Sequence, residues 1–249
     1  MRFSIDEIDS ARRTVYAHLP PTPQYAWPLL RERLGMDVWV KHENHTAAGA
    51  FKVRGGLTYF AELAHRQPRV RGVIAATRGN HGQSVGYAAR LHGLAATIVV
   101  PHGNSTEKNA AMRALGVQLI EHGEDFQAAR EYAMQLAGEQ GLHMVPSFHR
   151  DLVRGVATYW LEFFESFPAG GTPDVVFVPI GQGSGFCAAA AARAHTGAHS
   201  ALVGVVSAHA TTFLDSFRAR RVVAAPVGTV LADGVACRVA DEDALQVVL

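Results

Sequence analysis

Apolar positions along the chain follow two alternating patterns. Short runs rich in β-branched residues predict buried β-strands, and longer stretches in which apolar residues recur every three or four positions predict amphipathic helices. The predicted strands lie at 37–41, 72–76, 96–100, 117–120, 174–179 and 201–206. The predicted helices lie at 51–66, 80–92, 105–115, 125–139, 152–167 and 185–195.

The alternation of these elements predicts a fold of the α/β class. Strands that alternate with helices of about ten to fifteen residues indicate right-handed βαβ units and mainly parallel sheets. The strands are apolar throughout, so we expect both sheet faces to be covered and the strand at 174–179 to be buried. A stretch rich in Pro and Gly at 165–174 is interpreted as a loop and not as a domain linker. Asp241 is the predicted N-cap of a short helix near the end of the chain.

The composition is that of a globular protein with a substantial core. Of the 249 residues, 48% are hydrophobic and 18% are charged, which excludes disordered and fibrous classes. The 23 basic and 22 acidic side chains give a net charge of +1, without the basic excess typical of nucleic-acid or anionic-membrane binding. The first residues lack the apolar core that is typical of a signal peptide, and no apolar run approaches the roughly 20 residues of a membrane span. We therefore expect a cytoplasmic protein that acts on a small molecule.

The cysteines and histidines do not predict a metal site. Cys187 and Cys237 are too few and too far apart for a disulfide framework or a Cys-x-x-Cys site, which suits a reducing compartment. His42 and His45 lie three positions apart, but no further set of ligands with zinc-like spacing accompanies them. We therefore expect no bound metal.

Alternating glycines between a predicted strand and a predicted helix indicate a phosphate-binding loop. Gly181, Gly183 and Gly185 would let backbone N–H groups surround an anion at a helix N-terminus, although a tight turn alone could also require glycine. A dinucleotide-binding loop would need glycine where Phe186 stands, and a P-loop would need a lysine that this loop lacks. The loop therefore predicts a phosphate without a ribose, which fits pyridoxal phosphate.

Lys52 is the lysine that such a cofactor would require. The small residues that flank it are Gly49, Ala50, Gly55 and Gly56. We expect them to clear space for a flat ring against the backbone, whereas an ordinary solvated lysine at a helix start is the competing interpretation. The other lysines, Lys41 and Lys108, lack such neighbours.

Four sequence blocks resemble those of the fold-type II pyridoxal-phosphate enzymes. Within that group the blocks are most similar to the threonine/serine dehydratases (ammonia-lyases) and the related serine racemases. Their order and spacing match from about residue 20 to the end of the chain. The blocks are KHENHTAAGAFKVRGG (41–56), ATRGNHGQSVGYAAR (76–90), PIGQGSGF (179–186) and LADGV (231–235).

The resemblance implies a two-lobed, tryptophan synthase β-like fold with the cofactor in the cleft between the lobes. The large cofactor-binding domain would consist of residues 1–70 and 148–249, and the small domain of residues 71–147. A homodimer is also implied, because dimers are usual among the relatives.

The resemblance also implies a role for each block. Lys52 would form the Schiff base with the cofactor, Phe51 would pack near the ring, and Asn80 would hydrogen-bond its 3′ oxygen. Gly234 would face the pyridine ring. The loop implied to bind the cofactor phosphate consists of Gly181, Gln182, Gly183, Ser184 and Gly185. The residues implied to bind the substrate are Thr77, Arg78, Gly79, Asn80 and His81. An ordinary role as a capping or core residue stays open for the histidine.

The implied activity is that of a lyase. The freed amine of Lys52 would remove the α-proton of a β-hydroxy amino acid, and loss of the β-hydroxyl would yield a 2-oxo acid and ammonia. Two alternatives stay open. One is a β- or γ-replacement enzyme of the same fold, and the other is a non-catalytic, truncated remnant.

The sequence departs from the family pattern in three places. Arg78 stands where serine racemases carry a serine that exchanges a proton, which argues against racemisation and leaves open a substrate with a second acid group, such as a 3-hydroxyaspartate. Ser207 stands where metal-activated relatives carry a glutamate ligand, so no divalent-cation site is predicted. The final segment of the family is absent, and we expect either a fragment or a neighbouring chain that covers the gap.

Overall fold

The computed structural model describes residues 1–167, 171–228 and 231–249. Its helices are α1 (Ile5–Tyr16), α2 (Pro28–Leu34), α3 (Lys52–Arg66), α4 (Asn80–Leu91), α5 (Thr106–Ala114), α6 (Phe126–Gln140), α7 (Arg150–Glu165), α8 (Ser184–Thr196), α9 (Thr212–Ala219) and α10 (Glu242–Val248). Its strands are β1 (Gln24–Ala26), β2 (Trp39–Lys41), β3 (Gly72–Ala76), β4 (Ala95–Val100), β5 (Gln118–Glu121), β6 (His143–Met144), β7 (Val175–Pro179) and β8 (Ala201–Val205). Each predicted strand and helix is confirmed to within a few residues.

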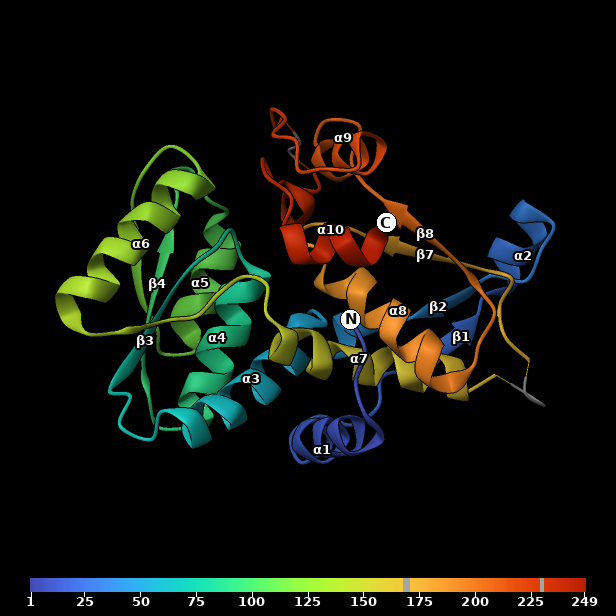
Figure 1. Cartoon of the computed structure of the whole chain (residues 1–249), viewed down its shortest axis with the longest axis horizontal. Coiled ribbons are helices and arrows are strands. Elements are labelled where there is room, and N and C mark those ends of the chain that lie inside the picture. Colours follow the sequence, from blue (N-terminus) through green and yellow to red (C-terminus); the bar gives the residue numbers. More distant parts are fainter. Residues whose placement is uncertain (168–170, 229–230) are drawn as a thin grey trace.

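A four-stranded parallel sheet forms one end of the molecule in Figure 1. Its strand order is β5-β4-β3-β6, and β3 is buried along its whole length. Helix α6 covers one face through Ala129 and Ala133, and α4 and α5 cover the other through Val85 and Met112. Covered faces explain why these strands are apolar without alternation. The domain boundaries at 70/71 and 147/148 stay a prediction.

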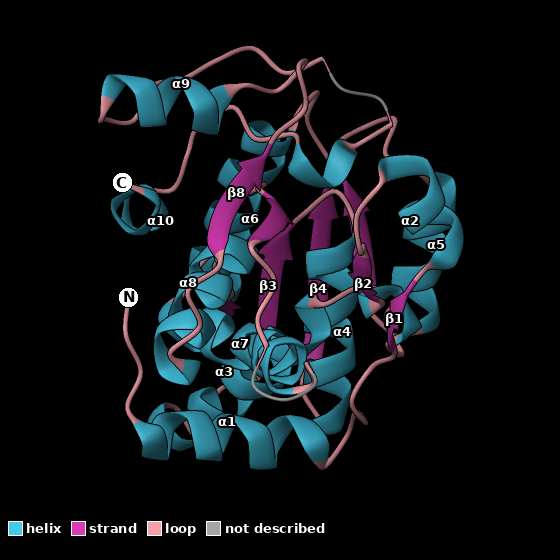
Figure 2. Ribbon diagram, turned by 90° about the vertical axis from the view of Figure 1, so that its right-hand side faces the viewer, coloured by secondary structure: helices cyan, strands magenta, loops and turns pink. Residues whose placement is uncertain are grey.

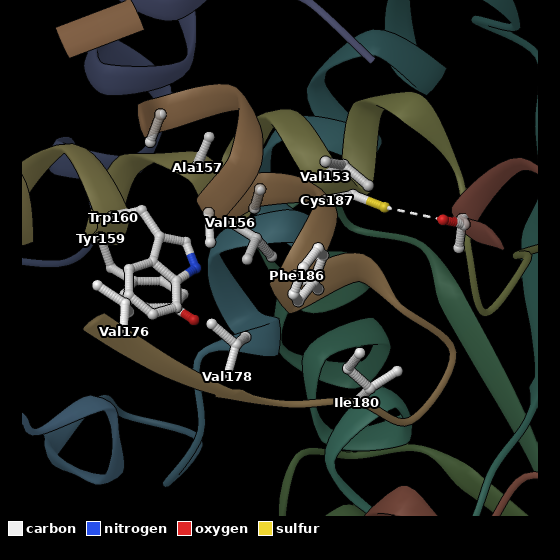
Figure 3. Close-up of a cluster of buried hydrophobic side chains, with 14 of the residues drawn as sticks. Val153, Val156, Ala157, Tyr159, Trp160, Val176, Val178, Ile180, Phe186 and Cys187 are labelled. Atoms are coloured by element: carbon white, nitrogen blue, oxygen red, sulfur yellow. Dashed lines mark hydrogen bonds between the residues drawn. The ribbon is translucent and has the colours of Figure 1, made fainter. Parts of the chain in front are cut away.

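A second parallel pair, β7 and β8, lies apart from this sheet in Figure 1, with α8 as its crossover helix. Figure 2 shows α8 beside β8. Val176 and Val178 of β7 face α7 and α8, and Figure 3 shows them packed among the side chains of those helices. The prediction that this strand is fully buried is wrong, because Val175 is 44% exposed and Phe177 is 68% exposed. Alternate side chains of a strand point to opposite faces, and in the described part of the chain only one face of this pair is covered.

Glycines bring α3 against two other helices. A methyl group on Gly55 would lie 2.6 Å from the carbonyl oxygen of Leu152 in α7, and one on Gly56 would lie 2.4 Å from Oγ of Ser84 in α4. The prediction that these two glycines clear space for a flat ring is therefore wrong. They allow the backbones of α3, α4 and α7 to approach closely, which fixes the helix that begins at Lys52.

A buried ion cluster locks α3 to α7. The guanidinium of Arg54, which has no exposed surface, donates to Glu43 (Nε to Oε2, 2.8 Å) and to Glu162 (Nη1 to Oε1, 2.6 Å). Lys41 also donates to Glu162, from Nζ to Oε2 at 2.6 Å. Burial acts to raise the pKa of Glu162, but the hydrogen bonds and charge of Arg54 hold it below its usual value. The cluster holds a residue two positions after Lys52 in a fixed place.

Helix α10 confirms the predicted cap. The side chain of Asp241 accepts a hydrogen bond from the N–H of Ala244 at 3.1 Å, and Leu245 is fully buried. In the described residues we find neither a helix that is long and apolar enough to cross a membrane nor a group of three or more His, Cys, Asp or Glu side chains that could hold a metal ion.

Candidate active site

A cavity lies at the carboxyl ends of β3, β6 and β7. Such ends are where ligands bind in parallel α/β folds, because loops and helix N-termini meet there. The lining residues are Lys52, Ala76, Thr77, Arg78, Gly79, Asn80, His81, Phe126, Ser147, Gln182, Asp233, Gly234, Ala236 and Cys237. The cavity thus unites parts of all four sequence blocks, which are spread over most of the chain.

Lys52 is the first residue of α3 and its amine is held among neighbours from other elements. Its Nζ donates to Oγ of Ser184 at 3.4 Å and lies 4.9 Å from the centre of the Phe51 ring. Burial lowers the pKa of Lys52, and the nearby Cys237 opposes this shift. A lowered pKa increases the fraction of unprotonated amine, the form that attacks a carbonyl carbon or accepts a proton.

The predicted phosphate loop joins β7 to α8 as expected. Gly183 is the N-cap of α8 with φ +98°, a left-handed conformation that favours glycine. In the described part of the chain no side chain caps this helix, so its first N–H groups are open to an anion. A methyl group on Gly181 would lie 2.8 Å from the carbonyl oxygen of Gly234, which brings this loop against the LADGV block.

The loop before α4 offers a second anion site. The N–H of Gly79, the N-cap, donates to Oγ1 of Thr77 at 3.0 Å. No side-chain cap is found for α4 among the described residues, and Asn80 and His81 form its first turn. This arrangement suits a carboxylate, because open N–H groups and the helix dipole both favour negative charge.

His81 is buried beside this loop. Its Nε2 has no hydrogen-bond partner among the described residues. Burial, reinforced by the positive charge of Lys52, lowers the pKa of His81 to about 3, so the ring is neutral near pH 7. A buried ring nitrogen without a partner in the wall of a cavity indicates a polar ligand.

An ion pair links Asp233, in the wall of the cavity, to helix α5. Nζ of Lys108 in α5 lies 2.5 and 2.6 Å from the two carboxylate oxygens of Asp233. The stem of Lys108 also covers Gly79, where a methyl group would lie 2.6 Å from its Cδ. The pair therefore links the loop before α4 to the LADGV block, which contains Gly234.

Most of the predicted site residues line the cavity. Those that do are Lys52, Thr77, Arg78, Gly79, Asn80, His81, Gln182 and Gly234. Of the others, Phe51 and Ser184 contact Lys52, and Gly181 lies against Gly234. Gly183 and Gly185 do not line the cavity; a methyl group on Gly183 would lie against Ala244, and one on Gly185 would lie against Phe51. Their proposed roles stay predictions.

Several lining residues were missed in the sequence. Ser147 follows β6, at the edge of the sheet where the carboxyl ends meet, but a strand of two residues gives no periodicity from which this place could be predicted. Phe126 and Cys237 gave no signal either. Burial raises the pKa of the Cys237 thiol, and the charge of Lys52 and a hydrogen bond with Gln182 oppose that shift.

The donor set fits pyridoxal phosphate. Open N–H groups at the start of α8 suit its phosphate, and Lys52 suits its aldehyde because the amine is buried, with a lowered pKa, beside that helix. The loop before α4 suits the carboxylate of an amino acid.

Comparison with known proteins decides the family. The profile of the family described as "Pyridoxal-phosphate dependent enzyme" matches residues 15–249. The chain belongs to this family. It is 34% identical over 210 residues to the L-threonine ammonia-lyase of Geobacter sulfurreducens, covering 83% of this chain and 51% of that protein. It is 30% identical over 230 residues to the L-threo-3-hydroxyaspartate ammonia-lyase of Saccharomyces cerevisiae, covering 92% of this chain and 69% of that protein.

The fold is similar to that of a solved threonine deaminase. The processed form of threonine deaminase isoform 2 from Solanum lycopersicum superposes with a TM-score of 0.86 at 26% identity, over 99% of this chain and 72% of that one. The predicted α/β fold of the fold-type II enzymes is thereby confirmed. The chain spans about half the length of the curated threonine ammonia-lyases that it matches.

Proposed function

We propose that the protein is a pyridoxal-phosphate-dependent ammonia-lyase that converts a β-hydroxy amino acid of the threonine/serine type into a 2-oxo acid and ammonia. The observation that carries the proposal is one cavity that unites the Lys52 amine, the loop at Gly79 and the loop at Gln182. Ammonia-lyases among the relatives support the same reaction class.

The proposed reaction uses two anion-binding sites. The N–H groups at the start of α8, behind Gly183, would hold the cofactor phosphate, and those of Asn80 and His81 would hold the substrate carboxylate. Holding the substrate at a fixed point orients its Cα–H bond towards Lys52. When bound, the cofactor supplies an electron sink for the negative charge that develops at the substrate α-carbon.

Lys52 would accept the α-proton of the substrate. Its lowered pKa increases the unprotonated fraction of the amine, the form in which Nζ can accept the α-proton. The β-hydroxyl then leaves with a proton as water, and the unsaturated amine that remains is hydrolysed to the 2-oxo acid and ammonia. Threonine would give 2-oxobutanoate, and serine would give pyruvate.

The direct test is oxo-acid release. The purified protein, loaded with cofactor, is mixed with L-threonine or L-serine, and 2-oxo acid and ammonia are measured together. We expect equal amounts of both products, and none with Lys52→Ala. A product that needs an added thiol would favour a β-replacement enzyme, and cofactor binding without any product would favour a non-catalytic remnant.

Two further expectations from the sequence stay proposals. A cytoplasmic location and a homodimer are both compatible with an enzyme of amino-acid metabolism. Sedimentation of the purified protein tests the second of them.

A further inference from the structure

We propose that Arg78 binds a second carboxylate on the substrate, so that the preferred substrates are β-hydroxy amino acids with two carboxylates, of the 3-hydroxyaspartate class. The inference rests on the proposed function and narrows its substrate class. Sequence identity does not distinguish substrates with one carboxylate from substrates with two, because the threonine and hydroxyaspartate ammonia-lyases match this chain at similar levels.

Arg78 is a charged side chain without a counter-charge. It lines the cavity and is only partly exposed. Within the described ranges its guanidinium makes no hydrogen bond and no ion pair, whereas Arg54, Arg66 and Arg154 are all paired with carboxylates. A guanidinium stays protonated at any working pH, so a partly buried one gains from an anionic partner.

The other charges of the cavity are already matched. Asp233 is paired with Lys108 through both carboxylate oxygens. The start of α8 is assigned to the cofactor phosphate, the start of α4 to the substrate α-carboxylate, and Lys52 to the cofactor aldehyde. Arg78 remains. A substrate with one carboxylate, such as serine, would leave its charge unmatched.

His81 supplies an independent sign of a ligand at this place. Its Nε2 is buried, lacks a partner among the described residues and belongs to the wall of the same cavity. Because the ring is neutral, it can contribute a hydrogen bond but no positive charge. The full positive charge on this loop comes from Arg78.

The position of Arg78 suits a short dicarboxylate. The residue immediately precedes Gly79, the N-cap of the helix whose start is assigned to the α-carboxylate. Its side chain therefore starts next to the proposed site of the α-carboxylate. Its planar guanidinium can donate two parallel hydrogen bonds to a second carboxylate of the same substrate. A four-carbon acid presents its two carboxylates at that short separation.

The first test compares two substrates in three proteins. Values of kcat/KM for threo-3-hydroxyaspartate and L-serine are measured with the cofactor-loaded wild type, Arg78→Gln and Arg90→Gln. Arg90 is an exposed residue of α4, the helix that follows Arg78; it does not line the cavity and controls for the loss of one charge. We expect the wild type to prefer the dicarboxylate, and Arg78→Gln to lose about 10- to 100-fold more on that substrate than on serine, as expected for a charged hydrogen bond.

The second test needs no turnover. L-Aspartate and L-alanine, which lack the β-hydroxyl, are titrated into each protein by calorimetry. We expect aspartate to bind more tightly to the wild type and to Arg90→Gln, and the two ligands to bind alike in Arg78→Gln. This result without any oxo-acid release would support the role of Arg78 while overturning the proposed lyase function.

Two outcomes overturn the inference. One is a wild type that neither prefers the dicarboxylate substrate nor binds aspartate more tightly than alanine. The other is an equal loss on serine and hydroxyaspartate in Arg78→Gln, which would assign Arg78 to the α-carboxylate.

Discussion

His81 makes the stability of the protein depend on pH. Its pKa is about 3 in the folded chain and 6.5 when unperturbed, so the unfolded state binds a proton at a pH where the folded state does not. Stability from this group is therefore present above pH 6.5 and is lost as pH falls towards 3. We expect His81 alone to reduce the free energy of unfolding by about 2 kcal/mol between neutral pH and about pH 5.

Denaturant unfolding at several pH values measures this slope. His81→Gln removes the titrating group, so its curve is expected to be flatter than that of the wild type, whatever its absolute stability. His65→Gln changes an exposed histidine of α3 and serves as the control, with a slope like the wild type. Parallel curves for the wild type and His81→Gln would contradict the assignment.

The sequence was enough to identify residues with a chemical role, but not to predict which residues pack around them. Lys52 was recognised because glycine-rich and alanine-rich positions surround it, yet Gly55 and Gly56 accommodate neighbouring helices and not a ring. The lack of a partner for Arg78 and for Nε2 of His81 within the described ranges depends on residues distant in sequence, so no local pattern indicates it.

At the level of elements, the contact between α3 and α7 is set by glycine. A methyl group on Gly155 would lie 2.2 Å from the carbonyl oxygen of Arg54 and 2.3 Å from Oγ1 of Thr58, so one helix must shift. We expect Gly155→Ala to lower the free energy of unfolding by about 1–3 kcal/mol, as overpacking does elsewhere. Denaturant unfolding is the measurement.

Gly138→Ala is the matched control. Gly138 lies inside α6 with no atom within 4 Å of an added methyl group. Alanine there removes the entropic cost of a helical glycine, and we expect a gain of about 0.5–1 kcal/mol. Similar effects of the two substitutions would show that the close contact between α3 and α7 does not govern stability.

The sequence predicted the positions of these strands and helices better than it predicted how exposed they are. Continuous apolar strands indicate burial on both faces, which holds for β3 but not for β7, where Phe177 is exposed. Whether a second layer covers a strand depends on the whole arrangement and not on the strand itself. Short elements such as β6 were missed, because two residues carry no periodicity.

For the molecule as a whole, the ion pair between Lys108 and Asp233 is expected to hold the LADGV block against the loop before α4, which both line the cavity. The partners lie 125 positions apart in sequence, and no local pattern reveals their contact. Lys108→Met keeps a stem over Gly79 but removes the charge. Because the pair is partly exposed, we expect little change in global stability, while the Kd of the cofactor rises by about 3- to 10-fold.

Arg113→Met provides the comparison for this variant. Arg113 lies on the same helix, α5, and pairs with Glu121 at 3.4 Å on the surface. Cofactor titration followed by absorbance should show weaker binding only for Lys108→Met. If both variants bind the cofactor like the wild type, the pair does not contribute to cofactor binding.

The central claim is that the amine of Lys52 bonds to the cofactor. The chain has three lysines, at positions 41, 52 and 108, so a covalent label can be assigned without ambiguity. Borohydride reduction of the cofactor-loaded protein, followed by digestion and mass spectrometry, identifies the bonded residue. We expect the mass of the reduced cofactor on the peptide that contains Lys52; a label on another lysine, or none at all, would contradict the account.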